Sequence, residues 1–107
     1  MPELVVILST CPDAASAERI ARALVEERLA ACVNCVPGLR SFYRWQEQIQ
    51  ADAEVLLVIK SAADRFEAVE ALVRKLHPYE LPELIAVPLT TGSAPYLAWL
   101  RAEIGER

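Results

Sequence analysis

The sequence has few of the residues that build the commonest catalytic and phosphate-binding motifs. It contains one histidine, His77, and only three glycines, Gly38, Gly92 and Gly105, among 107 residues. Glycines this far apart exclude a glycine-rich loop that holds phosphate groups. A single histidine without a nucleophile motif also gives no Ser-His-Asp arrangement. We therefore expect a protein that is not an enzyme and that uses no organic cofactor.

Positive charge and long apolar runs are scarce as well. Lysine and arginine number 11 against 15 acidic residues, for a net charge of −4, whereas nucleic-acid-binding proteins carry a basic patch. No apolar run approaches the roughly 20 residues that cross a bilayer, and Met1, Pro2 and Glu3 lack the basic start of a secretory signal. Three cysteines are an odd number and too few for a fold held together by disulfides, so we expect reduced thiols. We expect a cytoplasmic protein without nucleic-acid or membrane partners.

Hydrophobic residues, by contrast, are abundant, at 54% of the chain. A single domain over residues 1–107 hides only about 60–70% of the surface of its unfolded chain. Apolar surface therefore remains after folding, and closed assembly with identical subunits is the commonest way to cover it. The composition predicts a homo-oligomer.

The order of the hydrophobic patterns predicts an α+β fold. Apolar runs predict strands over residues 3–9, 32–36, 39–45, 53–60 and 84–89, and amphipathic periodicity predicts helices over 14–31, 66–76 and 96–104. This order is that of a ferredoxin-like βαββαβ sandwich with a long hairpin and an extra C-terminal helix. Helices would cover one face of the sheet, and another subunit would cover the second face.

Local signals refine the ends of these elements. Asp13 is the predicted cap of the first helix, and residues 61–64 (SAAD) have the spacing of a capping box before the second helix. Pro37 predicts a distortion in its strand. The polar residues 46–50 predict a hairpin turn between two long strands.

A polar stretch, residues 77–83 (HPYELPE), follows the second predicted helix. Its two prolines favour a rigid, non-helical turn. One interpretation is a polar site in which the imidazole of His77 and the two carboxylates gather. The other is a helix end at which the histidine side chain caps the last carbonyl groups. The sequence leaves both open.

The cysteines differ in their predicted roles. Cys32 and Cys35 form a CxxC pair, but residues i and i+3 of a strand face opposite sides, which favours two small buried hydrophobes over a redox or zinc site. Cys11 is predicted in the loop before a helix, where a thiolate is stabilised. Together, Cys11, His77 and Glu83 can bind copper or zinc if the fold brings them together.

The aromatic residues gather near turns and near the C-terminus. They are Tyr43, Trp45, Tyr79, Tyr96 and Trp99. Packing in the core or between subunits explains most such aromatics, and a cage around a ligand is the less common alternative.

Several blocks of the sequence, in order, resemble the CutA divalent-cation tolerance family. They are residues 23–34 (ALVEERLAACVN), 41–45 (SFYRW), 59–60 (IK), 77–83 (HPYELPE) and 96–100 (YLAWL). The resemblance implies a ferredoxin-like protomer similar to the PII signalling proteins, assembled as a homotrimer through its hairpin arms. It also implies copper or other divalent-metal binding without enzymatic activity.

The resemblance implies metal ligands at His77 and Glu83 and, in some members, at a cysteine ending the first strand. This chain has Ser9 at the place of that cysteine and Cys11 two residues later. It also has Glu47 where the family's hairpin turn usually carries glycine, which predicts a wider turn. Two alternatives to metal tolerance remain. One is a PII-like sensor that binds a small anionic ligand between subunits through Arg44 and Lys60, and the other is a trimeric scaffold.

Overall fold

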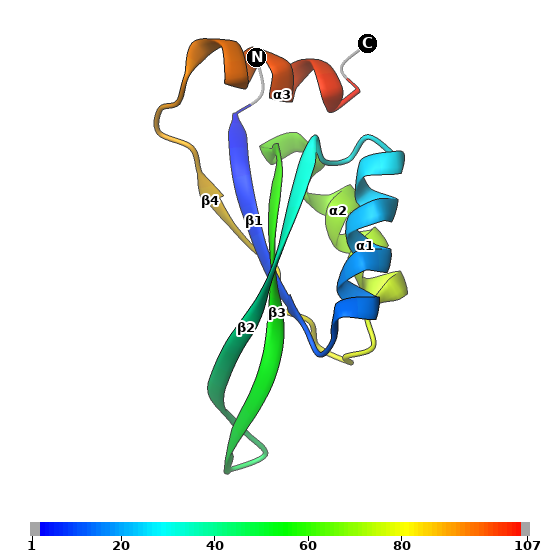
Figure 1. Ribbon diagram of the computed structural model, residues 1–107, viewed down its shortest axis with the longest axis vertical. Helices are drawn as coiled ribbons and strands as arrows, with labels where there is room; N and C mark the ends of the chain where they lie inside the picture. Colours follow the sequence, from blue (N-terminus) through cyan, green and yellow to red (C-terminus); the bar gives the residue numbers. More distant parts are fainter. Residues whose placement is uncertain (1–2, 106–107) are drawn as a thin grey trace.

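A four-stranded antiparallel sheet and two helices packed on one of its faces form the two layers of the described chain (Figure 1). The structure is a computed structural model, and it describes residues 3–105. The predictions made on Met1 and Pro2, and the outermost ends of the domain predicted over 1–107, lie outside these residues. The sheet order β2-β3-β1-β4 confirms the ferredoxin-like fold.

The strands and helices follow the predicted order. The strands are β1 (Leu4–Cys11), β2 (Cys32–Trp45), β3 (Gln48–Ala62) and β4 (Ile85–Pro88). The helices are α1 (Ala14–Glu26), α2 (Phe66–Leu76) and the extra C-terminal α3 (Ala94–Glu103), and a single 3₁₀ turn (Ala63–Arg65) precedes α2.

The main core lies between the sheet and helices α1 and α2. Alternate residues of β1, such as Ile7, face the helices and are fully buried, as the period of two in a strand requires. Ile20 and Leu24 of α1, and Val69 and Val73 of α2, meet them at helical spacing and have no exposed area. A second cluster beneath α3 closes one end of the sheet.

The predicted end of the first helix was wrong. α1 ends at Glu26 because Arg28 enters the left-handed region, with φ of 58°. The amides of Leu29 and Ala30 then bond back to the carbonyl of Leu24, at 3.0 and 3.3 Å. The alanines that extended the helical pattern therefore lead into β2.

The predicted caps had opposite outcomes. Asp13 caps α1 as predicted, and its Oδ1 accepts from the Ser16 amide at 2.8 Å. The capping box over residues 61–64 was wrong, since Ser61 belongs to β3 and its hydroxyl donates to the carbonyl of Leu29 at 2.6 Å. That bond ties β3 to the segment after α1, and α2 starts through the 3₁₀ turn instead.

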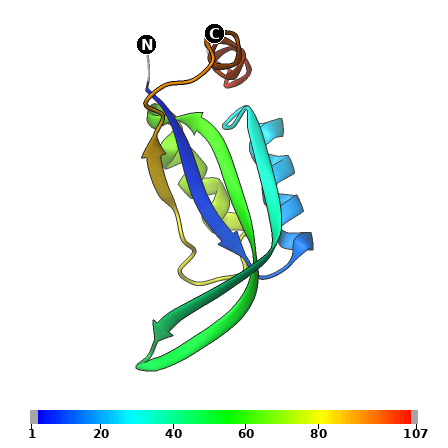
Figure 2. The ribbon, with the colours of Figure 1, turned by 60° about the vertical axis from the view of Figure 1, so that its left-hand side comes forward.

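Strands β2 and β3 extend beyond the helices as a two-stranded arm (Figures 1 and 2). The distortion predicted at Pro37 is confirmed by a register shift between Val36 and Leu39. The wider turn predicted at Glu47 was wrong. The turn has only two residues, Gln46 and Glu47, and both take positive φ, at 50° and 66°.

The second face of the sheet carries no helix among residues 3–105, as Figure 2 shows. Large apolar side chains lie on it at Val36, Ile85 and Val87, which are 43%, 52% and 47% exposed. The single chain therefore leaves the surplus apolar surface that its composition predicts. None of the described helices is long and apolar enough to cross a membrane.

Candidate functional site

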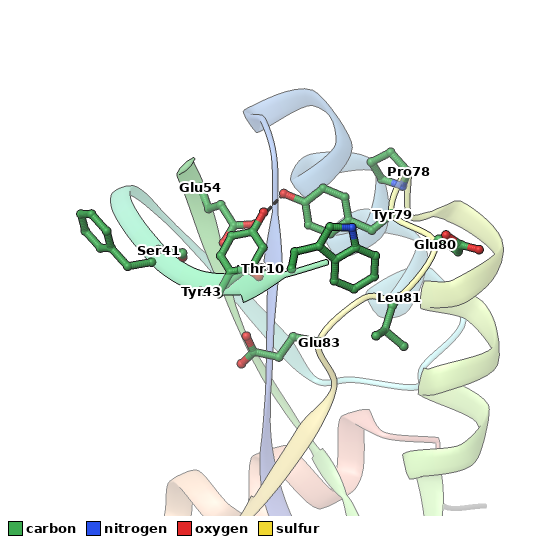
Figure 3. A pocket seen from close by; sticks show the side chains of 11 residues that line it. Thr10, Ser41, Tyr43, Glu54, Pro78, Tyr79, Glu80, Leu81 and Glu83 are labelled. Atoms are coloured by element: carbon green, nitrogen blue, oxygen red, sulfur yellow. Dashed lines mark hydrogen bonds between the residues drawn. The ribbon is translucent and has the colours of Figure 1, made fainter. Parts of the chain in front are cut away.

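A pocket of about 640 Å³ lies where the arm meets the turn over residues 77–83 (Figure 3). Residues from three segments far apart in sequence line it. They are Thr10 of β1; Ser41, Phe42, Tyr43, Trp45 and Glu54 of the arm strands; and Pro78, Tyr79, Glu80, Leu81 and Glu83 of the turn. Within the part of the chain that the structure describes, the lining holds three carboxylates and no basic side chain.

A hydrogen bond between Tyr79 and Glu54 links the turn to β3 (Figure 3). The Tyr79 hydroxyl donates to Oε2 of Glu54 at 2.6 Å, and Glu54 is only 7% exposed. Burial, together with this bond to an anion, raises the pKa of Tyr79. The phenol therefore stays protonated and remains a donor at neutral pH.

A second pair of the same kind lies on the arm. The Tyr43 hydroxyl donates to Asp52, and this hydrogen bond is the main cause of the raised pKa of Tyr43. Two phenols thus satisfy two carboxylates beside the pocket without neutralising their charge.

His77 is buried, and both its ring nitrogens are engaged. Nε2 lies 2.7 Å from the carbonyl of Thr10, and Nδ1 accepts from the amide of Tyr79 at 3.0 Å. Since a carbonyl only accepts and a backbone amide only donates, the ring must be the tautomer with the proton on Nε2. In this arrangement neither nitrogen offers a free lone pair to a cation.

The alternative interpretation, in which the His77 side chain caps the last helix carbonyls, was wrong, because both ring nitrogens bond elsewhere. α2 ends at His77, where the backbone amide bonds to the carbonyl of Val73 at 2.8 Å. The imidazole itself reaches across to β1 and lies 4.7 Å from the Tyr79 ring, between ring centroids. The histidine therefore fastens the turn to the sheet.

Cys11 is the last residue of β1 rather than part of a loop, and it is fully buried. Burial is the main cause that raises the pKa of its thiol to about 11, and the nearby Cys35, Asp13 and Glu54 act in the same direction. A thiolate is the form that binds metal, and Cys11 is held as the thiol. Ser9, at the place of the family cysteine, is also buried, with a hydroxyl that has no hydrogen-bond partner.

The three predicted ligands are therefore in different settings. Glu83 lines the pocket, whereas His77 and Cys11 are buried and are not among its lining residues. Across residues 3–105, no group of three or more histidine, cysteine and carboxylate side chains is arranged to hold a metal ion. The ligand set Cys11, His77 and Glu83 remains a prediction.

The other cysteine pair, Cys32 and Cys35, diverges as its spacing predicts, but the prediction that both are buried was wrong, because Cys32 is half-buried and Cys35 is exposed. Cys32 faces Lys60, whose Nζ lies 3.9 Å from its Sγ, while Cys35 faces the side of α1. All three cysteines are free thiols. Lys60 also donates to Oδ1 of Asn34 at 2.5 Å, and neither Lys60 nor Arg44 lines the pocket.

Sequence reasoning missed Glu54, the buried carboxylate of the pocket. The signal was present, because Glu54 is the one charged residue at the start of the apolar run over residues 53–59. Its partner Tyr79 stood among aromatics interpreted as packing residues. Only the pairing of β3 with the turn shows that the two form a unit.

The CutA1 divalent ion tolerance protein family model matches residues 5–103. The chain belongs to this family. The CutA protein of Thermus thermophilus, named as a divalent-cation tolerance protein, is 50% identical over 100 residues, which cover 94% of this chain and 97% of that protein. Human CutA is 49% identical over 92 residues, or 86% of this chain, but the match spans only 51% of the human protein.

The solved structures agree with this membership. CutA1 of Oryza sativa superposes with a TM-score of 0.95 at 39% identity, covering 99% of this chain and 97% of that one. Family members named for a compartment include a chloroplastic CutA of Arabidopsis thaliana and a periplasmic CutA of Archaeoglobus fulgidus. The CutA fold is thus shared by proteins whose names assign different locations.

Proposed function

We propose that this CutA-family protein is a cytoplasmic homotrimer that binds a divalent cation, copper foremost, and serves metal tolerance without catalysing a reaction. Family membership supports the tolerance role. The observation that supports the binding site is the turn over residues 77–83. Its exposed carboxylates, Glu80 and Glu83, line one pocket that has no basic lining residue between residues 3 and 105. The free thiols support a reducing compartment.

His77 and Glu83 are the proposed ligands, since imidazole and carboxylate both suit Cu(II) and Zn(II). Coordination at Nε2 of His77 would require its proton to move to Nδ1, so that the bonds to the Thr10 carbonyl and the Tyr79 amide would both be lost. Cys11 joins as a third ligand only when its thiol loses a proton. Metal binding that includes Cys11 would therefore release the thiol proton and strengthen as the pH rises.

The trimer is supported by the uncovered sheet face and by the arm. The arm carries Phe42 and Ile49, which are 69% and 65% exposed. Apolar residues this exposed on an extended hairpin are typical of a surface that packs on another subunit.

Calorimetry with Cu(II) and Zn(II) on the reduced protein, with light scattering on the same sample, tests the proposal. We expect a trimer that binds about one ion per protomer with a Kd below about 1 μM. Glu83→Gln and His77→Gln should each weaken binding about tenfold, or about 1.4 kcal/mol. Glu67→Gln on α2 is the matched control for Glu83→Gln, because it removes one carboxylate away from the pocket.

A trimer that binds neither ion would reject the metal role. An unchanged titration for His77→Gln would remove His77 from the site and leave it as a structural link between the turn and β1.

A further inference from the structure

The pocket has aromatic walls, which binding of a metal ion does not use. Tyr43 and Trp45 of the arm and Tyr79 of the turn all line it. Its volume of about 640 Å³ lies within the range of pockets for small organic molecules, roughly 300–1,000 Å³. A single metal ion needs far less space, and aromatic rings are not its ligands.

Among residues 3–105, the side chains that line the pocket carry negative charge and include no cation. Glu54 is 7% exposed, and the bond that it accepts there comes from the neutral phenol of Tyr79. A carboxylate removed from water costs free energy unless a cation or several hydrogen bonds compensate it. Glu80 and Glu83 line the same space, and no lysine, arginine or histidine of the described residues does. The site therefore favours a cation and disfavours the anionic ligand of the sensor alternative.

We propose that this pocket binds an organic cation, an alkylammonium or guanidinium group. Its charge would lie near the carboxylate of Glu54, and its apolar surface would contact the rings of Trp45, Tyr43 and Tyr79. Aromatic faces attract cations through the ring quadrupole, and tryptophan does so most strongly. Carboxylate and aromatic rings together select an organic cation over both a neutral molecule of the same shape and a bare metal ion. The proposal goes beyond divalent-cation tolerance and does not depend on it.

The cationic group has two possible sources. One is a diffusible small molecule. The other is an arginine of a second copy of this chain, because Arg40 and Arg44 are exposed and alternate along β2 with Tyr43 and Trp45. Alternation places Arg40 and Arg44 on the strand face opposite to Tyr43 and Trp45. The guanidinium of Arg40 lies 5.7 Å from the centroid of the Phe42 ring, and neither arginine lines the pocket of its own chain.

Fluorescence titration of a Trp99→Phe variant tests the proposal, because Trp45 is then the only tryptophan left. The probes are choline and agmatine, with EDTA present so that metal binding plays no part. We expect a saturable change in Trp45 emission. The neutral isostere of choline, 3,3-dimethyl-1-butanol, should bind at least about tenfold more weakly, since it lacks the charge.

Calorimetry on variants of the full chain locates the site. Glu54→Gln and Trp45→Leu should each weaken choline binding about tenfold, and Glu67→Gln should leave it unchanged. Because Trp45 is 42% exposed, Trp45→Leu should fold. It therefore tests the site even if Glu54→Gln fails to fold.

Further results show where the cation comes from and whether the proposal is correct. Binding that appears only after Arg40→Gln or Arg44→Gln would assign the cation to a neighbouring subunit. Equal affinity for choline and its neutral isostere, or no binding by the parent and both arginine variants, would overturn the proposal. A parent protein that binds choline but not copper would reject the metal role and leave this proposal standing.

Discussion

Three side chains near the pocket, two of them buried and Tyr79 half-buried, are held in neutral forms by their surroundings. His77 is the Nε2–H tautomer because Thr10 accepts from one nitrogen and Tyr79 donates to the other. Tyr79 stays a phenol through burial and its bond to Glu54. Cys11 stays a thiol because its surroundings exclude water and carry negative charge. Each of these three side chains must lose a proton or a partner before it can bind a metal ion directly.

Cys11 gives a prediction about stability at high pH. Its thiol pKa is about 11 when folded against an ordinary value of 9.0, so the unfolded chain loses its proton first as the pH rises. The free energy of unfolding should therefore fall between about pH 9 and 11, by about 1–2 kcal/mol from this group. Urea unfolding at pH 8 and pH 10.5 measures the loss, and Cys11→Ala should show a smaller one. Equal losses in both proteins would contradict this assignment.

Among the elements, the β2–β3 arm departs most from a compact domain. Its two strands pair to the tip, from Leu39↔Glu54 to Trp45↔Gln48, but beyond the helices they lack a layer to pack on. The tip itself is strained, because Gln46 and Glu47 both hold positive φ without being glycine. Such a two-residue turn suits the twist of a hairpin and favours Asn-Gly.

Relief of this strain should stabilise the protein. Glycine accepts positive φ at no steric cost, so Glu47→Gly should raise the free energy of unfolding by about 0.5–1 kcal/mol, after its larger loss of chain entropy. The urea midpoint measures the effect. Ala51→Gly, within β3 of the same arm, is the control and should lower stability. A lower midpoint for Glu47→Gly would show that the Glu47 side chain has a role at the tip.

At the scale of the whole molecule, the two faces of the sheet differ in what covers them. Helices α1 and α2 cover one face of the sheet, and the other face and the arm expose apolar side chains (Figure 2). The molecule measures 45 Å along its longest axis and 25 by 22 Å across, an elongated shape for its size. Contact with further copies would cover both exposed surfaces at once.

A matched pair of charge substitutions tests which face assembles. Val87 on the open face and Val25 on α1 are similarly exposed, at 47% and 44%. Val87→Glu should dissociate the assembly because it buries an unpaired charge, and Val25→Glu should not. Sedimentation or light scattering at several concentrations measures the mass. An assembly that survives Val87→Glu but not Val25→Glu would place the interface on the helical layer.

Much of the fold follows from local patterns. Asp13 marks the start of α1, and the proline after His77 marks the end of α2. The errors also have local causes. The helical spacing of the alanines continued past Glu26, and Ser61 had the spacing of a cap but lay inside a strand. Periodicity and spacing describe which structures a segment permits, and tertiary contacts choose between them.

The sequence by itself determined the order of the elements, the long arm, the surplus of apolar surface and the candidate turn over residues 77–83. These depend on hydrophobic period, capping and proline geometry, which act within a few residues. Only the tertiary structure decided what the candidate residues contact. His77 contacts Thr10, which is 67 residues away in the sequence, and Tyr79 contacts Glu54, which is 25 residues away. Such pairs are set by strand register and helix packing, so no local pattern records that Glu54 belongs to the pocket or that Cys11 lies in the core.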